Sequence, residues 1–273
     1  MSEYSIFEGT MADMTYVEIE TASINQACVL LPIAVIEGHG PHMCLGVDTY
    51  ITYALCKKIS EKLNEIGKQA LIAPPFYWGI NRANEAFPGS FTVRKTTLTA
   101  MLVDILLCIK KWGFKDIFLI NIHGDLSHNK AIIEAAQEAW LDHEVGVRAV
   151  LAEPLVKACK VTGNEDFILL QKTLMKGSID GFIDLHAGAM ETAWMFINFP
   201  GLVNVDLARE LGSSKTTTAG LITWAKGGQG ARGVIPRGYC GEPSRFDPDE
   251  AYEFERTLVQ ELAHAIAECL DVA

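Results

Sequence analysis

Short apolar runs alternate along the chain with longer stretches in which apolar positions recur at helical spacing. The runs that predict strands span 27–36, 69–76, 116–122 and 147–152, and the run at 181–185 is a fifth candidate. Alternating strand and helix patterns are typical of an α/β fold with a mainly parallel sheet. The stretch 192–199 fits a helix or a strand, and its pattern does not decide between them.

Four stretches have the spacing and the end signals of helices. They cover 48–67, 95–114, 127–143 and 247–270. A glycine ends each of the first two, and basic residues precede the second of these glycines. Ser127 is a good N-cap for the third helix, and Asp-Pro-Asp opens the fourth. Because no repeat or low-complexity linker interrupts the pattern, we expect a single domain over residues 1–273.

Composition excludes several classes of protein. Hydrophobic residues make up 49% of the chain and charged residues 21%, as in a globular protein with a sizeable core. The seven cysteines are scattered without a C-x-x-C pair, which favours free thiols in a reducing cytoplasm. No signal-peptide pattern opens the chain, and its longest apolar run, about ten residues, is too short to span a bilayer. We therefore expect a cytoplasmic protein without a membrane partner.

The net charge of −11 argues against a nucleic-acid partner, which requires a basic face. A locally positive pocket remains compatible with this charge. The arginines available for one are Arg82, Arg232, Arg237 and Arg245.

Ionisable residues directly follow three apolar runs. The three clusters are Glu37-Gly38-His39, His123-Gly124-Asp125 and Asp184-Leu185-His186. Open parallel sheets bind ligands at the carboxyl ends of their strands, and residues two apart in an extended chain point to the same side. Mixed imidazole and carboxylate donors suit Zn²⁺ or Mn²⁺, and Asp48, at the start of a helix, is the natural bridge between two ions.

Each of these residues also has a plain structural interpretation. A single His next to Gly is more often a turn residue than a ligand, and Asp48 alone would be a helix N-cap. His143 and His264 lie on helices without acidic partners and are assigned no role. The metal hypothesis therefore depends on the two paired motifs and on the third His that follows another apolar run.

The motifs resemble those of the creatininase (creatinine amidohydrolase) family. EGHGPHMCLGVDT at 37–49 is similar to the family signature E-x-H-G-P-H-x-x-L-G-x-D-T, and FPGS at 87–90 is similar to F-P-G-T. NIHGD at 121–125 resembles the N-G-H segment, and HAGAMET at 186–192 resembles H-A-G-E-x-E-T. The order of the motifs agrees from about residue 30 to residue 195.

This resemblance implies a three-layer α/β/α sandwich and a homo-oligomer such as a hexamer. It also implies two divalent ions per subunit, Zn²⁺ and/or Mn²⁺. The implied metal ligands are Glu37, His39, Asp48 as the bridge, and His123, with Asp125 and Glu191 as further candidates. The implied catalytic residues are His186 and Glu191.

The sequence departs from the family pattern at several positions. Gly38 replaces Gln, Ile122 replaces the Gly before His, and Ala189 replaces the first Glu of the third motif. Asp125 stands where creatininase itself has Glu and is one methylene shorter. Ala189 removes a carboxylate from near the substrate, and together these departures weaken the case for creatinine as the substrate and leave the metal chemistry intact.

We therefore expect a hydrolase that opens a small cyclic metabolite at an amide or amidine C–N bond by metal-activated water. His186 would pass a proton to the leaving group, and Glu191 would either ligate a metal or accept a proton from water. The candidate substrate-binding residues are His42, Tyr77, Trp78 and Trp194. Aromatic residues are more often core, and His42 is as well suited to orienting its loop.

Two alternatives remain open at this point. The first is a ring-opening hydrolase of a carbocyclic diketone or lactone, because the same activated water attacks any suitable carbonyl. The second is a non-catalytic metal-binding protein that serves maturation or assembly. His186 and Glu191 argue against the second alternative, since metal storage needs no additional acid–base groups.

Overall fold

The central sheet has five parallel strands in the order β2-β1-β3-β4-β5. The computed structural model describes residues 4–179 and 182–272. Its sheet strands are β1 (Cys28–Pro32), β2 (Ala70–Ile72), β3 (Ile117–Ile120), β4 (Val147–Ala152) and β5 (Ile168–Gln171). Cys28 of β1 lies opposite Ala70 of β2, and Val29 lies opposite Ile117 of β3. All residues of β1 and β3 are buried, which explains why these strands appear as continuous apolar runs.

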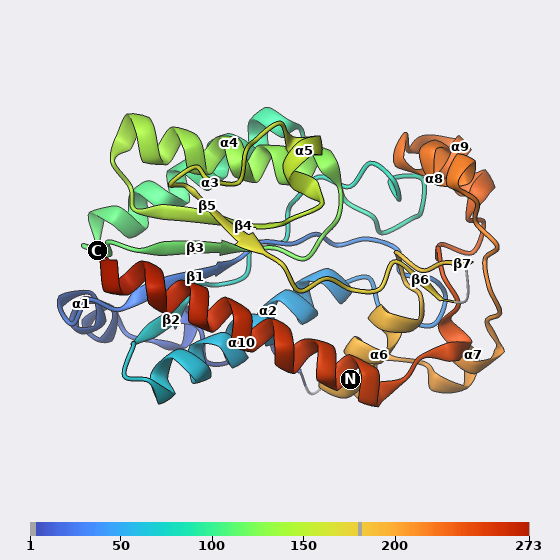
Figure 1. Cartoon of the computed structure of the whole chain (residues 1–273), viewed down its shortest axis with the longest axis horizontal. Coiled ribbons are helices and arrows are strands. Elements are labelled where there is room, and N and C mark those ends of the chain that lie inside the picture. The colour runs from blue at the N-terminus through green and yellow to red at the C-terminus, as the bar shows by residue number, and fades with distance from the viewer. Residues whose placement is uncertain (1–3, 180–181, 273) are drawn as a thin grey trace.

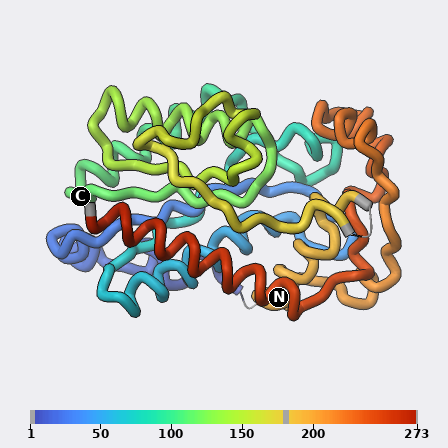
Figure 2. The backbone as a smooth tube through the Cα atoms, in the orientation of Figure 1, coloured from blue at the N-terminus to red at the C-terminus, as the bar shows by residue number. Residues whose placement is uncertain are grey.

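Helices cover both faces of this sheet and produce three layers (Figures 1 and 2). One face packs against α2 (Val47–Glu65), α6 (Ala189–Asn198) and α10 (Pro248–Val272). The other packs against α1 (Tyr16–Ile24), α3 (Lys95–Lys111), α4 (Leu126–His143) and α5 (Leu155–Cys159). Successive residues of β1 alternate between the two cores, as the period of a strand requires. The expected α/β/α sandwich with a parallel sheet is therefore confirmed.

Shorter elements gather beyond the carboxyl ends of the strands, at one end of the molecule (Figure 1). They are the hairpin β6 (Ser178–Ile179) and β7 (Phe182–Ile183), and the helices α7 (Val205–Glu210), α8 (Thr218–Ala225) and α9 (Gly228–Val234). The 3₁₀ helices are η1 (Met11–Asp13), η2 (Pro200–Leu202) and η3 (Pro243–Arg245). No helix within the described ranges is long and apolar enough to cross a bilayer.

The structure corrects two expectations about individual elements. The strand candidate at 181–185 lies partly outside the described residues, and its described part forms β7 of the hairpin instead of a strand of the central sheet. The fifth sheet strand is β5, which is short and mostly half-buried and therefore lacks a clear apolar run. The undecided stretch 192–199 is helical as far as Asn198, within α6.

The start of α4 also differs from the prediction. Its N-cap is Asp125, whose Oδ1 accepts hydrogen bonds from the backbone N–H groups of Ser127 (2.7 Å) and His128 (3.0 Å). Ser127 therefore lies inside the first turn. The carboxylate of Asp125 satisfies two of the N–H groups that every helix leaves unpaired at its start.

Candidate metal centre

The segment after β1 brings Glu37 and His39 to the carboxyl end of the sheet. Both are buried, with 2% and 1% of their surface exposed. The backbone N–H of Glu37 donates to the carbonyl of Leu45 (2.9 Å), which closes residues 37–45 into a loop. Gly40 adopts a φ of +66° in this loop, and a Cβ there would lie 2.8 Å from Nδ1 of His42. Only glycine fits this close, left-handed turn.

Asp48 and His123 approach Glu37 from two further elements. Asp48 lies in the first turn of α2, where the helix dipole favours a carboxylate, and His123 follows β3. Nδ1 of His123 lies 3.3 Å from Oε1 of Glu37 and 3.4 Å from Oδ2 of Asp48. One potential ligand atom from each of these three residues lies within 4.8 Å of the other two, close enough to hold one metal ion.

A second such group shares Asp48 with the first. Nε2 of His39 lies 3.8 Å from Oδ1 of Asp48 and 3.7 Å from Oε2 of Glu191, which α6 contributes. The ligand atoms of these three residues also lie within 4.8 Å of one another. Because different oxygens of Asp48 face the two groups, this carboxylate could contribute a ligand atom to each.

Backbone carbonyls fix the tautomers of the two histidines. Nδ1–H of His39 donates to the carbonyl of Glu37, and Nε2–H of His123 donates to the carbonyl of Ile80, each at 3.1 Å. The remaining ring nitrogen of each histidine therefore faces the carboxylates, and would be free to bind a metal once it carries no proton. Metal-ligating histidines almost always have this arrangement.

The donor set passes a further test of fit to a cation. Nε2 of His39 is fully buried and has no hydrogen-bond partner among the described residues. It lies between 3.7 and 3.9 Å from oxygens of Glu37, Asp48 and Glu191. An unpartnered buried nitrogen beside three carboxylates is costly unless a positive charge lies between them.

The pKa shifts of His123, Glu37 and Glu191 also indicate that the cluster favours a positive charge. Burial disfavours the charged form of His123, but Glu37 and Asp48 outweigh it and raise the pKa of His123 well above its usual value. Burial likewise opposes ionisation of Glu37, yet His123 and His186 hold its pKa at about 2. Burial, together with the charges of Asp48 and Glu37, raises the pKa of Glu191 to about 7. A proton on His123 thus does part of what a bound cation would do.

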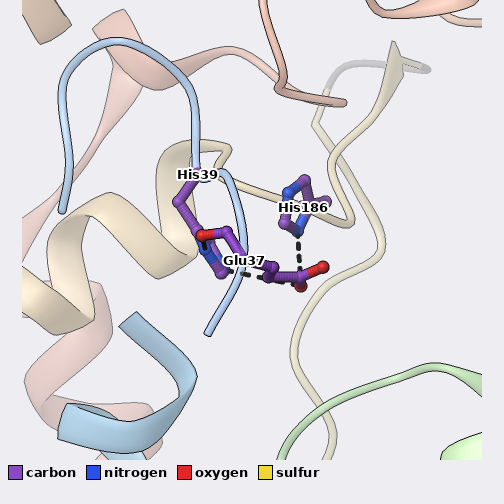
Figure 3. Close-up of side chains that lie close together, drawn as sticks. All are labelled: Glu37, His39 and His186. Carbon is purple, nitrogen blue, oxygen red and sulfur yellow. Dashed lines mark hydrogen bonds and ion pairs between the residues drawn. The ribbon is translucent and has the colours of Figure 1, made fainter. Parts of the chain in front are cut away.

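His186 lies on the other side of Glu37, and Figure 3 shows both its ring and that of His39 converging on this carboxylate. Nδ1 of His186 is 3.7 Å from Oε1 of Glu37, and the His39 and His186 ring centroids are 4.4 Å apart. Nε2 of His186 lies 2.8 Å from the carbonyl of Gly38 and 2.9 Å from Nδ2 of Asn84. Glu37, His39 and His186 form a third group with metal-ligand spacing.

Sequence reasoning missed two residues of the site. Nδ2 of Asn84 donates to Oε2 of Glu37 (2.9 Å), and Oδ1 of Asn84 accepts from the indole N–H of Trp224 (3.0 Å). The Trp224 ring lies 5.5 Å from that of His186, measured between centroids. Asn84 lies three residues before the FPGS motif, and this position could have marked it as a residue of the site. Trp224 comes from a segment that matches no motif.

Two predicted residues lie apart from the cluster. Asp125, expected as a further ligand, caps α4 with Oδ1 and accepts from the Arg82 backbone N–H with Oδ2 (3.0 Å), and it belongs to none of the groups with metal-ligand spacing among the described residues. Trp194, expected in the substrate pocket, is 1% exposed and belongs to the core. Its indole N–H donates to Oε2 of Glu255 on α10 (2.9 Å). These two residues stabilise the elements that carry the site.

The other candidate substrate contacts lie near the loop of the site. Nε2–H of His42 donates to Oγ1 of Thr192 on α6 (2.8 Å), so the loop-orienting interpretation fits the contacts of His42. Trp78 is 42% exposed, and its ring packs against those of Tyr77 (5.1 Å) and Phe91 (5.3 Å). These aromatic rings form a group at the surface.

Comparison with known proteins adds an independent line of evidence. The profile described as "Creatininase: Creatinine amidohydrolase" matches residues 12–266. The chain is 27% identical over 208 residues to a creatinine amidohydrolase of Pseudomonas putida, which covers 74% of this chain and 75% of that protein. It is 25% identical over 243 residues to a mycofactocin precursor peptide peptidase of Mycobacterium ulcerans. This match covers 88% of this chain and 84% of that protein.

Solved structures share the fold. The structure "Creatininase Mn" superposes with a TM-score of 0.70 at 20% identity, covering 95% of this chain and 98% of that one. A mutant creatininase described as "Zn-Zn type" superposes with a TM-score of 0.66 at 19% identity, covering 97% of this chain and 98% of that one.

Proposed function

The chain belongs to the creatininase family of metal-dependent hydrolases, and we propose that it opens a small cyclic substrate at an amide or amidine C–N bond. The observation that carries this proposal is the pair of ligand groups that share Asp48, with the imidazole of His186 alongside. Storage of a metal requires the ligands alone. An acid–base group next to them indicates chemistry.

In this proposal Glu37, Asp48 and His123 hold one divalent ion, and His39, Asp48 and Glu191 hold the other. Nitrogen and carboxylate donors suit Zn²⁺ and Mn²⁺. The names of two solved creatininase structures mention Mn and Zn, respectively. When bound, such ions activate water as a nucleophile and polarise the carbonyl under attack. Asp125 is not included, because it lies in none of the groups with metal-ligand spacing that the described residues form, and both of its oxygens accept from backbone N–H groups.

The remaining groups of the site position the substrate and move a proton. His186 would deliver a proton from Nδ1 to the leaving nitrogen, while its Nε2 stays paired with the Gly38 carbonyl (2.8 Å). Asn84 holds Oε2 of Glu37 through its amide and so leaves Oε1 for the cation. The burial of the cluster excludes bulk water, which strengthens each of these interactions.

The test combines metal analysis with a substrate panel. We expect the protein purified without chelator to contain one to two Zn²⁺ or Mn²⁺ ions per chain, as the two groups of ligand atoms allow. The metal-loaded protein should hydrolyse at least one cyclic amide in a panel that also includes lactones and carbocyclic diketones. Failure to bind metal, even with added Zn²⁺ or Mn²⁺, would exclude the proposed chemistry.

A second candidate function is hydrolysis of a linear peptide bond. The relative named as a peptide peptidase covers more of this chain than the P. putida enzyme does, which favours including peptides in the panel. The same donor set would serve either amide. Hydrolysis of peptides in the panel, without hydrolysis of any cyclic substrate, would assign the chain to this second function.

A further inference from the structure

The segment from Leu211 to Gly241 has a charge opposite to that of the rest of the chain. It contains four basic side chains and no Asp or Glu, within a chain whose net charge is −11. The four basic residues are Lys215, Lys226, Arg232 and Arg237. All are exposed, and none forms an ion pair within the part of the chain that the structure describes. We call residues 211–241 the basic cover.

The basic cover lies directly against the metal cluster. Its Trp224 contacts Asn84 and stacks near His186, as described above. Gly238 accepts a hydrogen bond from the backbone N–H of Gly40 (2.8 Å), next to His39, and the backbone N–H of Cys240 donates to the carbonyl of His186 (2.8 Å). Figure 1 shows α8 and α9 of this segment at the end of the molecule where the β6–β7 hairpin also lies. A ligand that approaches the cluster from this side passes the basic cover.

Arg232 of the basic cover contacts the loops around Glu37, and Arg237 lies next to Gly238, which is bonded to the loop of the site. The Arg232 guanidinium donates to the carbonyl of Ala86 (3.2 Å) and lies 5.4 Å from the centre of the Phe87 ring. Phe87 in turn packs on Gly38, where an added Cβ would be 3.2 Å from the Phe87 Cβ. Arg237 precedes Gly238, and its charge acts on the site loop, where burial, His186 and Arg237 together lower the pKa of His42 to about 4.

The cluster itself does not explain this positive charge. Its three carboxylates contribute −3 and two divalent ions would contribute +4, so with the ions bound the carboxylates leave no net negative charge for the basic side chains to balance. Unpaired positive charge beside such a centre favours the binding of an anion. A surface of one sign around a site raises the local concentration of ligands of the opposite sign.

We propose that the substrate is an anion, a cyclic amide that carries a carboxylate, and that Arg232 and Arg237 of the basic cover recognise this carboxylate. This inference rests on the proposed ring-opening function and specifies its substrate class. Guanidinium groups bind carboxylates through paired, charge-assisted hydrogen bonds, whereas a neutral ring offers them no such partner. The acidic remainder of the chain would repel the same substrate and leave this side as its route of entry.

The test compares rings that differ only in a carboxylate, using the zinc-loaded protein. The pairs are 5-oxoproline with 2-pyrrolidinone and dihydroorotate with dihydrouracil, and binding is measured by calorimetry at low and at high salt. We expect the carboxylate-bearing member of at least one pair to bind at least about tenfold more tightly, and the preference to shrink as salt is added. Arg232→Gln and Arg237→Gln should each reduce the preference at least about threefold, whereas Arg237→Lys, which keeps the charge but not the paired hydrogen bonds, should reduce it less than Arg237→Gln does.

The matched control is Arg256→Gln, since Arg256 is exposed on α10 and paired with Glu253 (2.7 Å). It should leave the preference unchanged, and thermal melts of each variant verify the fold. Equal or undetectable binding of both members in both pairs would overturn the inference. So would a preference that survives both Arg→Gln substitutions, because the carboxylate would then bind the metal alone. If the protein binds zinc and hydrolyses neutral rings equally well, the inference fails while the proposed function stands.

Discussion

His186 and Asp48 lie in one cluster but have different neighbours, so their substitutions should have different effects. Asp48 belongs to both of the ligand groups that would hold the two ions, whereas Nε2 of His186 is paired with the Gly38 carbonyl. We expect Asp48→Ala to empty at least one metal position, because the bridge is lost. We expect His186→Ala to keep most of its metal and to lower kcat by about 10²–10⁴-fold.

Metal analysis and steady-state kinetics on both variants provide the measurement. His186 also lies within ligand distance of Glu37 and His39. Equal loss of metal from the two variants would therefore show that His186 is a ligand. Full metal and full activity in His186→Ala would remove it from the mechanism.

Asp125 provides the converse test, because the sequence suggested a ligand and the structure shows a helix cap. Asp125→Ala removes the acceptor for three backbone N–H groups, those of Ser127, His128 and Arg82. We expect a loss of about 0.5–2 kcal/mol in the free energy of unfolding, measured by urea denaturation, with unchanged metal content. Asp125→Asn, which keeps an acceptor, is the control and should lose less. Loss of metal from Asp125→Ala at unchanged stability would restore Asp125 as a ligand.

The pKa of Glu191 predicts how metal affinity depends on pH. Burial, with the charges of Asp48 and Glu37, raises that pKa to about 7, so the side chain carries a proton below this pH in the metal-free protein. A divalent ion needs the carboxylate, and binding must release that proton. The proton on Glu191 should therefore make affinity fall more steeply as pH drops below about 7, by roughly tenfold per pH unit in addition to the effect of the proton that binding displaces from His123. Zn²⁺ titrations between pH 5.5 and 8 measure this dependence, and a flat profile would contradict it.

Most residues of the cluster were accessible to sequence reasoning because local spacing fixes where they point. Glu37 and His39 are two apart after a strand, and Asp48 opens a helix, so local spacing marked all three as candidates for one site. Asn84 and Trp224 were not accessible in this way. They meet only because a loop and helix α8, 140 residues apart in sequence at this contact, pack together in the fold.

At the scale of elements, α10 ties together the two helices that contribute Asp48 and Glu191. Glu255 of α10 is buried, pairs with Lys58 of α2, and accepts from Trp194 (2.9 Å) and Asn198 (2.7 Å) of α6. This network holds α2 and α6 in register on the same face of the sheet. It explains why Trp194 is a core residue instead of a substrate contact.

Glu255→Ala should therefore destabilise the fold. It leaves the Trp194 indole N–H and the Asn198 amide without this acceptor, at a cost of about 1–3 kcal/mol for each buried group left unpaired. Lys58 is partly exposed and retains water, so its contribution is smaller. Urea denaturation measures the loss, and Glu253→Ala, an exposed position on the same helix, is the control. A loss equal to that of the control would show that the network contributes nothing to stability.

The sequence predicted long elements better than short ones, for physical reasons. α2, α3, α4 and α10 have helical periodicity with start or stop signals, and their observed bounds differ from the predicted ones by a few residues at most. β5 has only four residues, mostly half-buried, and its position depends on pairing with β4. α6 is apolar and buried on most sides, so its composition resembles that of a buried strand.

At the scale of the whole molecule, the apolar surface far from the basic cover bears on assembly. A cavity of about 760 Å³ lies between α1, α3 and the segment after β2, lined mainly by apolar side chains such as Met11, Phe76 and Ile109. Around it, Tyr16 is 82% exposed, Ile24 75% and Trp112 51%. Patches of this kind mark surfaces that another molecule covers.

We therefore predict a homo-oligomer, as the family resemblance also implies. Light scattering at micromolar concentration should give a mass at least twice that of the 29.9 kDa chain. Trp112→Glu places a charge on this apolar face and should lower the mass, because burying an unpaired charge at an interface costs several kcal/mol. Leu141→Glu adds the same charge at a position that is 61% exposed on α4 and is the control. A mass of one chain for the unmodified protein would contradict the oligomer. An unchanged mass in Trp112→Glu would move the interface to another face.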